Sequence, residues 1–167
     1  MARFECLMRN LTAAAMISLA VACGSSPTTP DAPSIPDLQS APTRVVMQGK
    51  TLVLGASLGR DFMPIAPPDG RPLAGLVRIS AEDGSPVPTD ISAASTWVIH
   101  GSSSGDIWTT SGTPQPRDQT APALVLLLTG GPKWPPNDTV DVVVRLRDAT
   151  GRVTLLRAPQ QVIGASY

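Results

Sequence analysis

The chain has 167 residues, a net charge of zero at neutral pH, 18 prolines and 14 glycines. Prolines and glycines at this density interrupt helices every few residues, so a mostly helical domain is excluded, and the length is typical of one domain with appended segments. The balanced charge lacks the basic character of a nucleic-acid-binding protein, and we expect no nucleic-acid partner.

Residues 1–22 have the organisation of a signal peptide. A short polar start precedes an apolar run at residues 11–22 (LTAAAMISLAVA). Twelve residues in a helix extend about 18 Å, which is too short for the ~30 Å hydrocarbon core of a bilayer but suits a signal peptide. Cys6 is unusual at such a place, and a start at Met8 gives a more regular signal than a start at Met1. The mature protein is the same in either case.

The apolar run ends in Ala20-Val21-Ala22-Cys23, with Leu19 directly before it. This stretch resembles the lipobox of bacterial lipoproteins, in which a leucine-like residue and two small or aliphatic residues precede a cysteine. Leucine here lies one position earlier than in the family. The resemblance implies that the signal peptide is removed between Ala22 and Cys23 and that fatty acyl chains such as palmitate are attached to Cys23. Two or more acyl chains hold a protein stably on a membrane, at about 0.8 kcal/mol for each buried CH₂ group. The alternatives are an ordinary secretory signal that leaves a free thiol at Cys23, and an uncleaved anchor.

Residues 23–42 are predicted to be a tether. After Cys23, the stretch GSSPTTPDAPSIPDLQSAP contains five prolines and few bulky apolar residues. Such a segment cannot bury enough surface to offset its ordering entropy, so we expect it to be disordered and extended. The lipoprotein resemblance places the domain in the cell envelope, facing the periplasm or the exterior. Gly24 stands where an aspartate favours the inner membrane, so it favours the outer membrane in a cell that has one.

Residues 43–167 have the pattern of short strands between turns. Strands are predicted at 44–54 (with a turn or bulge at Gly49-Lys50), 76–80, 96–101, 106–110, 123–129, 141–147 and 152–158. The run at 123–129 is continuously apolar, as in a buried strand. The pattern predicts an all-β domain, more specifically an antiparallel β-sandwich of about seven or eight strands. Its architecture would be Ig-like, without the Ig disulfide, because both cysteines lie before residue 43.

The clearest predicted hairpin has its turn at residues 148–151. Alternation along the strand before the turn gives one face the side chains of Val140, Val142, Val144 and Leu146. The opposite face receives Asp141, Val143, Arg145 and Arg147. Arg145 and Arg147 are therefore a candidate patch for an anion or a lipid headgroup. The alternative is a solvated edge that discourages pairing with other sheets.

The tryptophans Trp97, Trp108 and Trp134 are further candidate contact residues. Exposed tryptophans stack on sugar rings or on protein partners, whereas buried ones fill a core. We expect at least two of the three in the core. Trp134, in the turn-like context GGPKWPPND, is the best candidate for exposure and partner contact.

Two further patterns raise the question of catalysis or metal binding. Residues 101–105 (GSSSG) match G-x-S-x-G with Ser103 as nucleophile, but a strand is predicted to follow, and the sole histidine, His100, precedes the serine. Calcium requires about six to eight oxygen ligands, and near one turn the chain offers only Asn137, Asp138 and Asp141. We expect no enzymatic activity, no metal and no cofactor.

The leading hypothesis is a membrane-anchored lipoprotein whose β-sandwich contacts another component of the cell envelope. The alternative is a lipoprotein domain that binds a carbohydrate or another small ligand through exposed tryptophans. An enzyme is a distant third possibility, because the histidine needed to activate a serine nucleophile is not in a suitable place.

Overall fold

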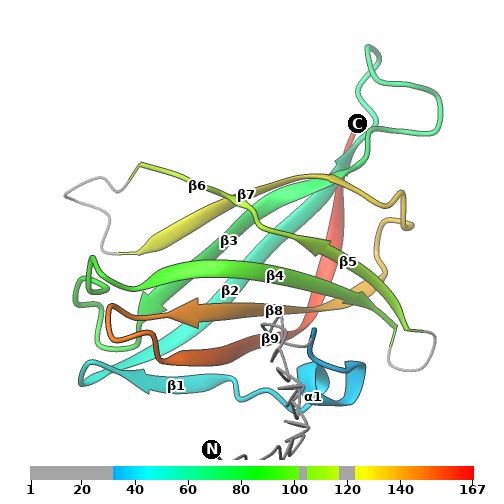
Figure 1. Ribbon diagram of the computed structural model, residues 1–167. Helices are drawn as coiled ribbons and strands as arrows, with labels where there is room; N and C mark the ends of the chain where they lie inside the picture. The colour runs from blue at the N-terminus through cyan, green and yellow to red at the C-terminus, as the bar shows by residue number, and fades with distance from the viewer. Residues whose placement is uncertain (1–31, 102–104, 117–122) are drawn as a thin grey trace, which may run out of the picture. The chain divides into compact units, whose positions relative to one another are not determined.

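Figure 1 shows the computed structural model of the chain, which describes residues 32–101, 105–116 and 123–167. The predicted signal peptide, residues 23–31 of the predicted tether (Cys23 included) and Ser103 lie outside the described residues. The folded unit is Pro33–Tyr167.

The described residues form one short helix and nine strands. These are α1 (Ile35–Gln39), β1 (Arg44–Met47), β2 (Lys50–Asp61), β3 (Leu73–Ala81), β4 (Ser92–His100), β5 (Asp106–Thr110), β6 (Thr113–Pro114), β7 (Leu124–Gly131), β8 (Thr139–Arg147) and β9 (Val153–Ser166). Each predicted strand region contains an observed strand, so the prediction of an all-β fold is confirmed. The break predicted at Gly49-Lys50 is a two-residue turn that lies one residue earlier, at Gln48-Gly49, where both residues have positive φ, as tight hairpins require.

The strands form a sheet in the order β5-β4-β8-β9-β2-β3-β7-β6, with β1 also paired to β2. The long strand β9 joins two halves of this sheet. Its residues Val153–Val162 pair antiparallel with β8, and Ile163–Ser166 then pair parallel with Leu58–Asp61 of β2. The other pairings are antiparallel. The sheet is therefore mixed, which corrects the expectation of a wholly antiparallel arrangement.

A bend in β9 explains the parallel pair. The register with β8 shifts between Val140 and Val142, and Gln160 has a φ of +53°. The backbone N–H of Gln160 donates to the Asp141 carboxylate at 2.8 Å, which stabilises the bulge. The backbone of Ile163 then exchanges hydrogen bonds with the turn at residues 137–138, so the strand leaves β8 and continues beside β2.

The curled sheet encloses one main core between its two halves (Figure 1). The half formed around β2, β3 and β7 contributes Val77, Ile79, Leu126 and Leu128. The half formed around β4, β8 and β9 contributes Val98, Val142, Val144 and Leu156. The predicted apolar face of β8 is confirmed, because each of its four members is at most 1 % exposed.

Helix α1 covers the other face of the β4-β8-β9 half. Ser34 and Asp37 form a capping box at its start, and Leu38 is fully buried in a second cluster of apolar side chains. That cluster also contains Ala41, Trp97, Ile99 and Val143. Residues 33–42 were predicted to belong to the tether, but in the structure they are part of the folded unit.

Candidate functional site

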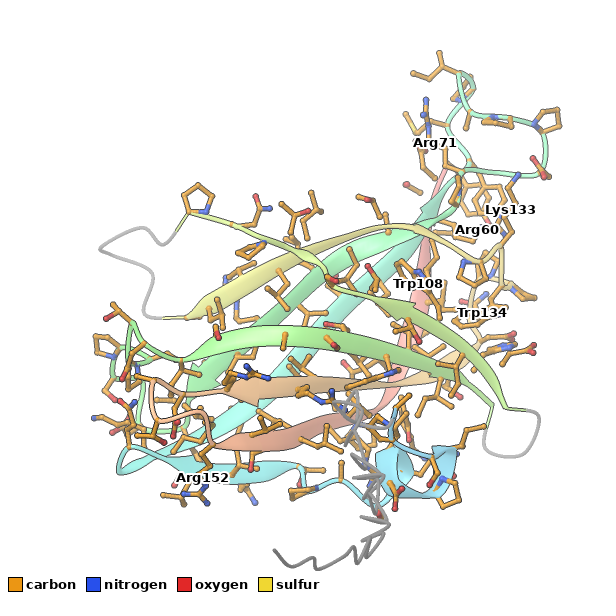
Figure 2. All side chains as sticks on the ribbon, viewed as in Figure 1. Arg60, Arg71, Trp108, Lys133, Trp134 and Arg152 are labelled. Atoms are coloured by element: carbon orange, nitrogen blue, oxygen red, sulfur yellow. The ribbon has the colours of Figure 1, made fainter. Side chains whose placement is uncertain are left out.

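The loop between β2 and β3, residues 62–72, projects from one end of the sheet (Figures 1 and 2). It carries exposed apolar side chains, with Met63 44 % and Ile65 85 % exposed. Tyr167, which follows β9, is 81 % exposed and stacks on Phe62 at the base of the loop, with 5.6 Å between ring centroids. We call Met63 and Ile65 the apolar tip. Exposed apolar groups that gather in one place mark contact surfaces more often than scattered ones do.

Two consecutive turns give the loop a defined shape. The backbone N–H of Ala66 donates to the carbonyl of Met63 at 2.7 Å, and that of Gly70 donates to the carbonyl of Pro67 at 2.8 Å. Each turn has a proline in its second position, where the fixed φ of proline favours the turn. A loop with such turns loses little conformational entropy when it binds a partner.

Arg60 holds the base of the loop. Its side chain is 6 % exposed, and its guanidinium donates hydrogen bonds to four backbone carbonyls. The acceptors are Arg71 at 3.0 Å, Lys133 at 3.1 Å, Trp134 at 3.2 Å and Asp69. The guanidinium carbon also lies 4.9 Å from the centroid of the Phe62 ring. One side chain thus joins β2 to the β2–β3 loop and to the segment that follows β7, as Figure 2 shows for Arg60, Lys133 and Trp134.

The charged side chains around the loop form neutral pairs. Arg71 Nε lies 3.2 Å from a carboxylate oxygen of Asp61, and the Lys133 ammonium contacts the carboxylate of Asp69. The hydrogen bond from Lys133 holds the pKa of the Asp69 carboxyl below its usual value. The apolar tip therefore lies between paired charges and not within a strongly basic or acidic surface.

A pocket of about 560 Å³ lies at the base of the same loop. Small residues of four neighbouring strands line it, including Gly59 of β2, Ala74 of β3, Thr129 of β7 and Gly164 of β9. Their neighbours Leu58 and Leu73 are buried in the core, so alternation directs the lining residues to the outer face of the sheet. The Asp61–Arg71 pair forms part of the wall. We call this hollow the small-residue pocket.

The structure corrects the prediction for Trp134. The side chain is only 9 % exposed and belongs to the main core. Its indole stacks on the imidazole of His100 with 4.7 Å between centroids, and its carbonyl accepts the hydrogen bond from Arg60. Trp97 is also buried, which confirms that at least two tryptophans lie in the core, and Trp108 is half-buried.

His100 lies at the end of β4, and its Nε2 is 2.8 Å from a carboxylate oxygen of Asp138. Side chains alternate along β4, because Val98 faces the main core whereas Trp97 and Ile99 face the cluster under α1. The imidazole therefore fastens the end of β4 to the turn before β8. Ser103, the candidate nucleophile of the G-x-S-x-G pattern, lies outside the described residues.

Arg145 and Arg147 share one face of β8, as predicted, but they lie away from the apolar tip. The guanidinium carbon of Arg145 is 5.0 Å from the centroid of the Trp97 ring, and Arg147 is exposed beside the β8–β9 turn. Arg152, after the same turn, is labelled in Figure 2 at the opposite side of the sheet from Arg60 and Arg71. The structure thus does not bring these arginines together with Trp134.

Asp141 has a structural role. Its carboxylate accepts hydrogen bonds from the backbone of Gln160 and from Arg157, at 2.8 and 3.0 Å, and these residues line a second pocket of about 380 Å³. Among the described residues there is no group of three or more histidine, cysteine, aspartate and glutamate side chains placed to bind a metal. The same parts of the chain contain no helix of the length and apolarity that a bilayer crossing requires.

Sequence reasoning missed the β2–β3 loop. The signal was present in DFMPIAPPDGRP, where Met63 and Ile65 stand in a proline-rich connection that is expected to be polar. Comparisons of the chain with protein-family models, with curated proteins and with solved structures find no match.

Proposed function

We propose that the chain is a lipoprotein of the bacterial cell envelope whose β domain binds a protein partner through the apolar tip. The observation that carries this proposal is the position of Met63 and Ile65, which are exposed at the end of a projecting loop with a rigid base. Exposed apolar side chains of this size contribute to binding when a partner removes them from water, at about 25 cal/mol for each Å² buried.

The location in the envelope is supported by the resemblance of the segment ending at Cys23 to a lipobox. In this proposal Cys23 carries the acyl chains, the residues after it link the lipid to the folded unit, and the outer membrane is the favoured site. The domain acts by binding and not by catalysis. A glycan-binding role through tryptophans has less support, because Trp97 and Trp134 are buried.

We also propose that the domain is a β-sandwich of Ig-like architecture. The two halves of the sheet contribute opposing apolar side chains to one core, which is the arrangement of a sandwich. Within each half of the sheet, neighbouring strands pair antiparallel, which supports this interpretation. The parallel pairing of β9 with β2 is the departure from it.

Photocrosslinking in living cells tests the binding role. The full chain is produced with a benzophenone amino acid in place of Ile65, and in a matched control in place of Val46, which is 60 % exposed on β1. We expect a discrete crosslinked protein product from position 65 and none from position 46. Equal labelling at the two positions, or no product from position 65, would contradict the proposal.

A further inference from the structure

The apolar tip and the small-residue pocket lie at the same end of one chain. The tip belongs to the loop that follows β2, and the pocket is formed by residues such as Gly59 and Ala74 at the base of that loop. One feature is an apolar protrusion, and the other is a hollow lined mainly by small side chains, with the Asp61–Arg71 pair and the largely buried Arg60 among its other residues. A surface that carries both is complementary to a copy of itself rotated by a two-fold axis, because each protrusion then meets the other copy's hollow.

We propose that a second copy of this chain occupies the small-residue pocket, with Met63 and Ile65 of each copy against Gly59 and Ala74 of the other. The inference rests on the proposed function, since it identifies the protein partner of the apolar tip. Substitution of the lining residues by larger ones would close the hollow. At Gly59 an added Cβ would already lie 3.3 Å from the carbonyl oxygen of Gly164.

The charged side chains around the apolar tip and the small-residue pocket favour a second copy of the chain as the occupant. The Asp61–Arg71 pair forms part of the pocket wall, and the Asp69–Lys133 pair lies on the loop and beside it. Two copies therefore approach each other without the repulsion that like charges impose at an interface. A membrane surface, in contrast, is usually bound by apolar side chains within a ring of unpaired basic residues, because the lipid headgroups are anionic.

Attachment to a membrane would favour a pair of copies. In the proposed function, the lipid on Cys23 holds each copy in the same leaflet. Confinement to a surface raises the effective concentration of each copy, so a small interface is sufficient for association.

Directed crosslinking tests the contact between the two features. Two differently tagged mature lipoproteins, in which signal removal and acylation of Cys23 leave no native free thiol, are prepared, one with Ile65→Cys and one with Ala74→Cys, and are mixed in detergent micelles under mild oxidation. We expect a mixed disulfide dimer between positions 65 and 74. The matched control, Val46→Cys mixed with Ala74→Cys, should give none, although Val46 is also well exposed. Equal yields from the two mixtures would overturn the proposal.

Sedimentation equilibrium provides a second measurement on the full chain in micelles. Ala74→Trp fills the pocket and Ile65→Asp places a charge at the tip, and each should raise the dimer Kd about tenfold or more. Val46→Asp should leave the dimer Kd unchanged. Circular dichroism checks that each variant is folded. A chain that is monomeric in wild-type form, or a dimer that neither variant weakens, would overturn the proposal.

The photocrosslinking experiment in cells distinguishes failure of the second-copy proposal from failure of the proposed binding role. A product from position 65 with twice the mass of the chain supports the second copy as occupant. A product with a different protein overturns the second copy and leaves the proposed function intact. The absence of any product overturns both.

Discussion

Arg60 shows how one side chain determines the shape of the candidate site. Its guanidinium is buried and donates hydrogen bonds to carbonyls of two segments, the adjoining β2–β3 loop and the distant segment after β7. The planar group has five N–H donors in a fixed arrangement, which a lysine ammonium cannot reproduce. The β2–β3 loop therefore depends on a residue of the adjoining strand.

Arg60→Lys should lower the free energy of unfolding by about 2 kcal/mol, because several partly buried carbonyls lose a charged donor. The exposed residue Arg78 provides the matched control, since Arg78→Lys should change the same quantity by less than about 0.5 kcal/mol. Urea denaturation of the two variants measures both values. Equal stability of the two variants would contradict the role assigned to Arg60.

Gly131 illustrates a second residue-scale requirement. A Cβ at this position would lie 2.7 Å from atoms of the Trp108 ring, so the side chain of β5 packs directly on the backbone of β7. Gly131→Ala should destabilise the domain by about 1–3 kcal/mol, because the indole must move. At Gly55 nothing lies within 4 Å of an added Cβ, so Gly55→Ala should be neutral or stabilising. A thermal unfolding comparison in which Gly131→Ala is the more stable variant would refute this packing.

At the scale of elements, the predictable parts were those with a regular pattern. The apolar face of β8 and the alternation of β4 follow directly from residue order. Helix α1 was missed because its one buried anchor, Leu38, stands in a proline-rich stretch, and the apolar surface that covers Leu38 comes from β4 and β8. The final residues of β9 were missed because their partner strand, β2, is about a hundred residues away in sequence.

The candidate site could not be predicted for the same reason, because its parts come from segments that are distant in sequence. The apolar residues of the β2–β3 loop have no periodicity, and the small-residue pocket exists only where four strands meet. The indole of Trp134 packs on His100 of β4, and its carbonyl accepts a hydrogen bond from Arg60 of β2, so its neighbours come from distant strands. Local pattern could identify Trp134 as part of a turn, but not the residues that cover it.

Leu38→Ala tests the attachment of α1 to the sheet. Removal of a fully buried leucine side chain costs about 2–5 kcal/mol, so a large loss of stability is expected if the helix is part of the cooperative unit. Ser34→Ala, which removes only the helix cap, should cost about 1 kcal/mol. If the two variants unfold at the same denaturant concentration as the wild type, α1 does not contribute to the fold.

At the scale of the whole molecule, we propose that a lipid at Cys23 holds a β domain whose contact surface is the apolar tip. The residues before the folded unit, which begins at Pro33, would link this domain to the membrane. In this proposal, Cys23 determines where the apolar tip acts.

Mass spectrometry of the mature protein from its native membrane is the sharpest test of lipid attachment at Cys23. We expect an amino-terminal peptide that begins at Cys23 and carries the added mass of fatty acyl chains, with no peptide from residues 1–22. A mature chain that retains residues before Cys23, or that has an unmodified thiol at Cys23, would show that the protein is not anchored in this way.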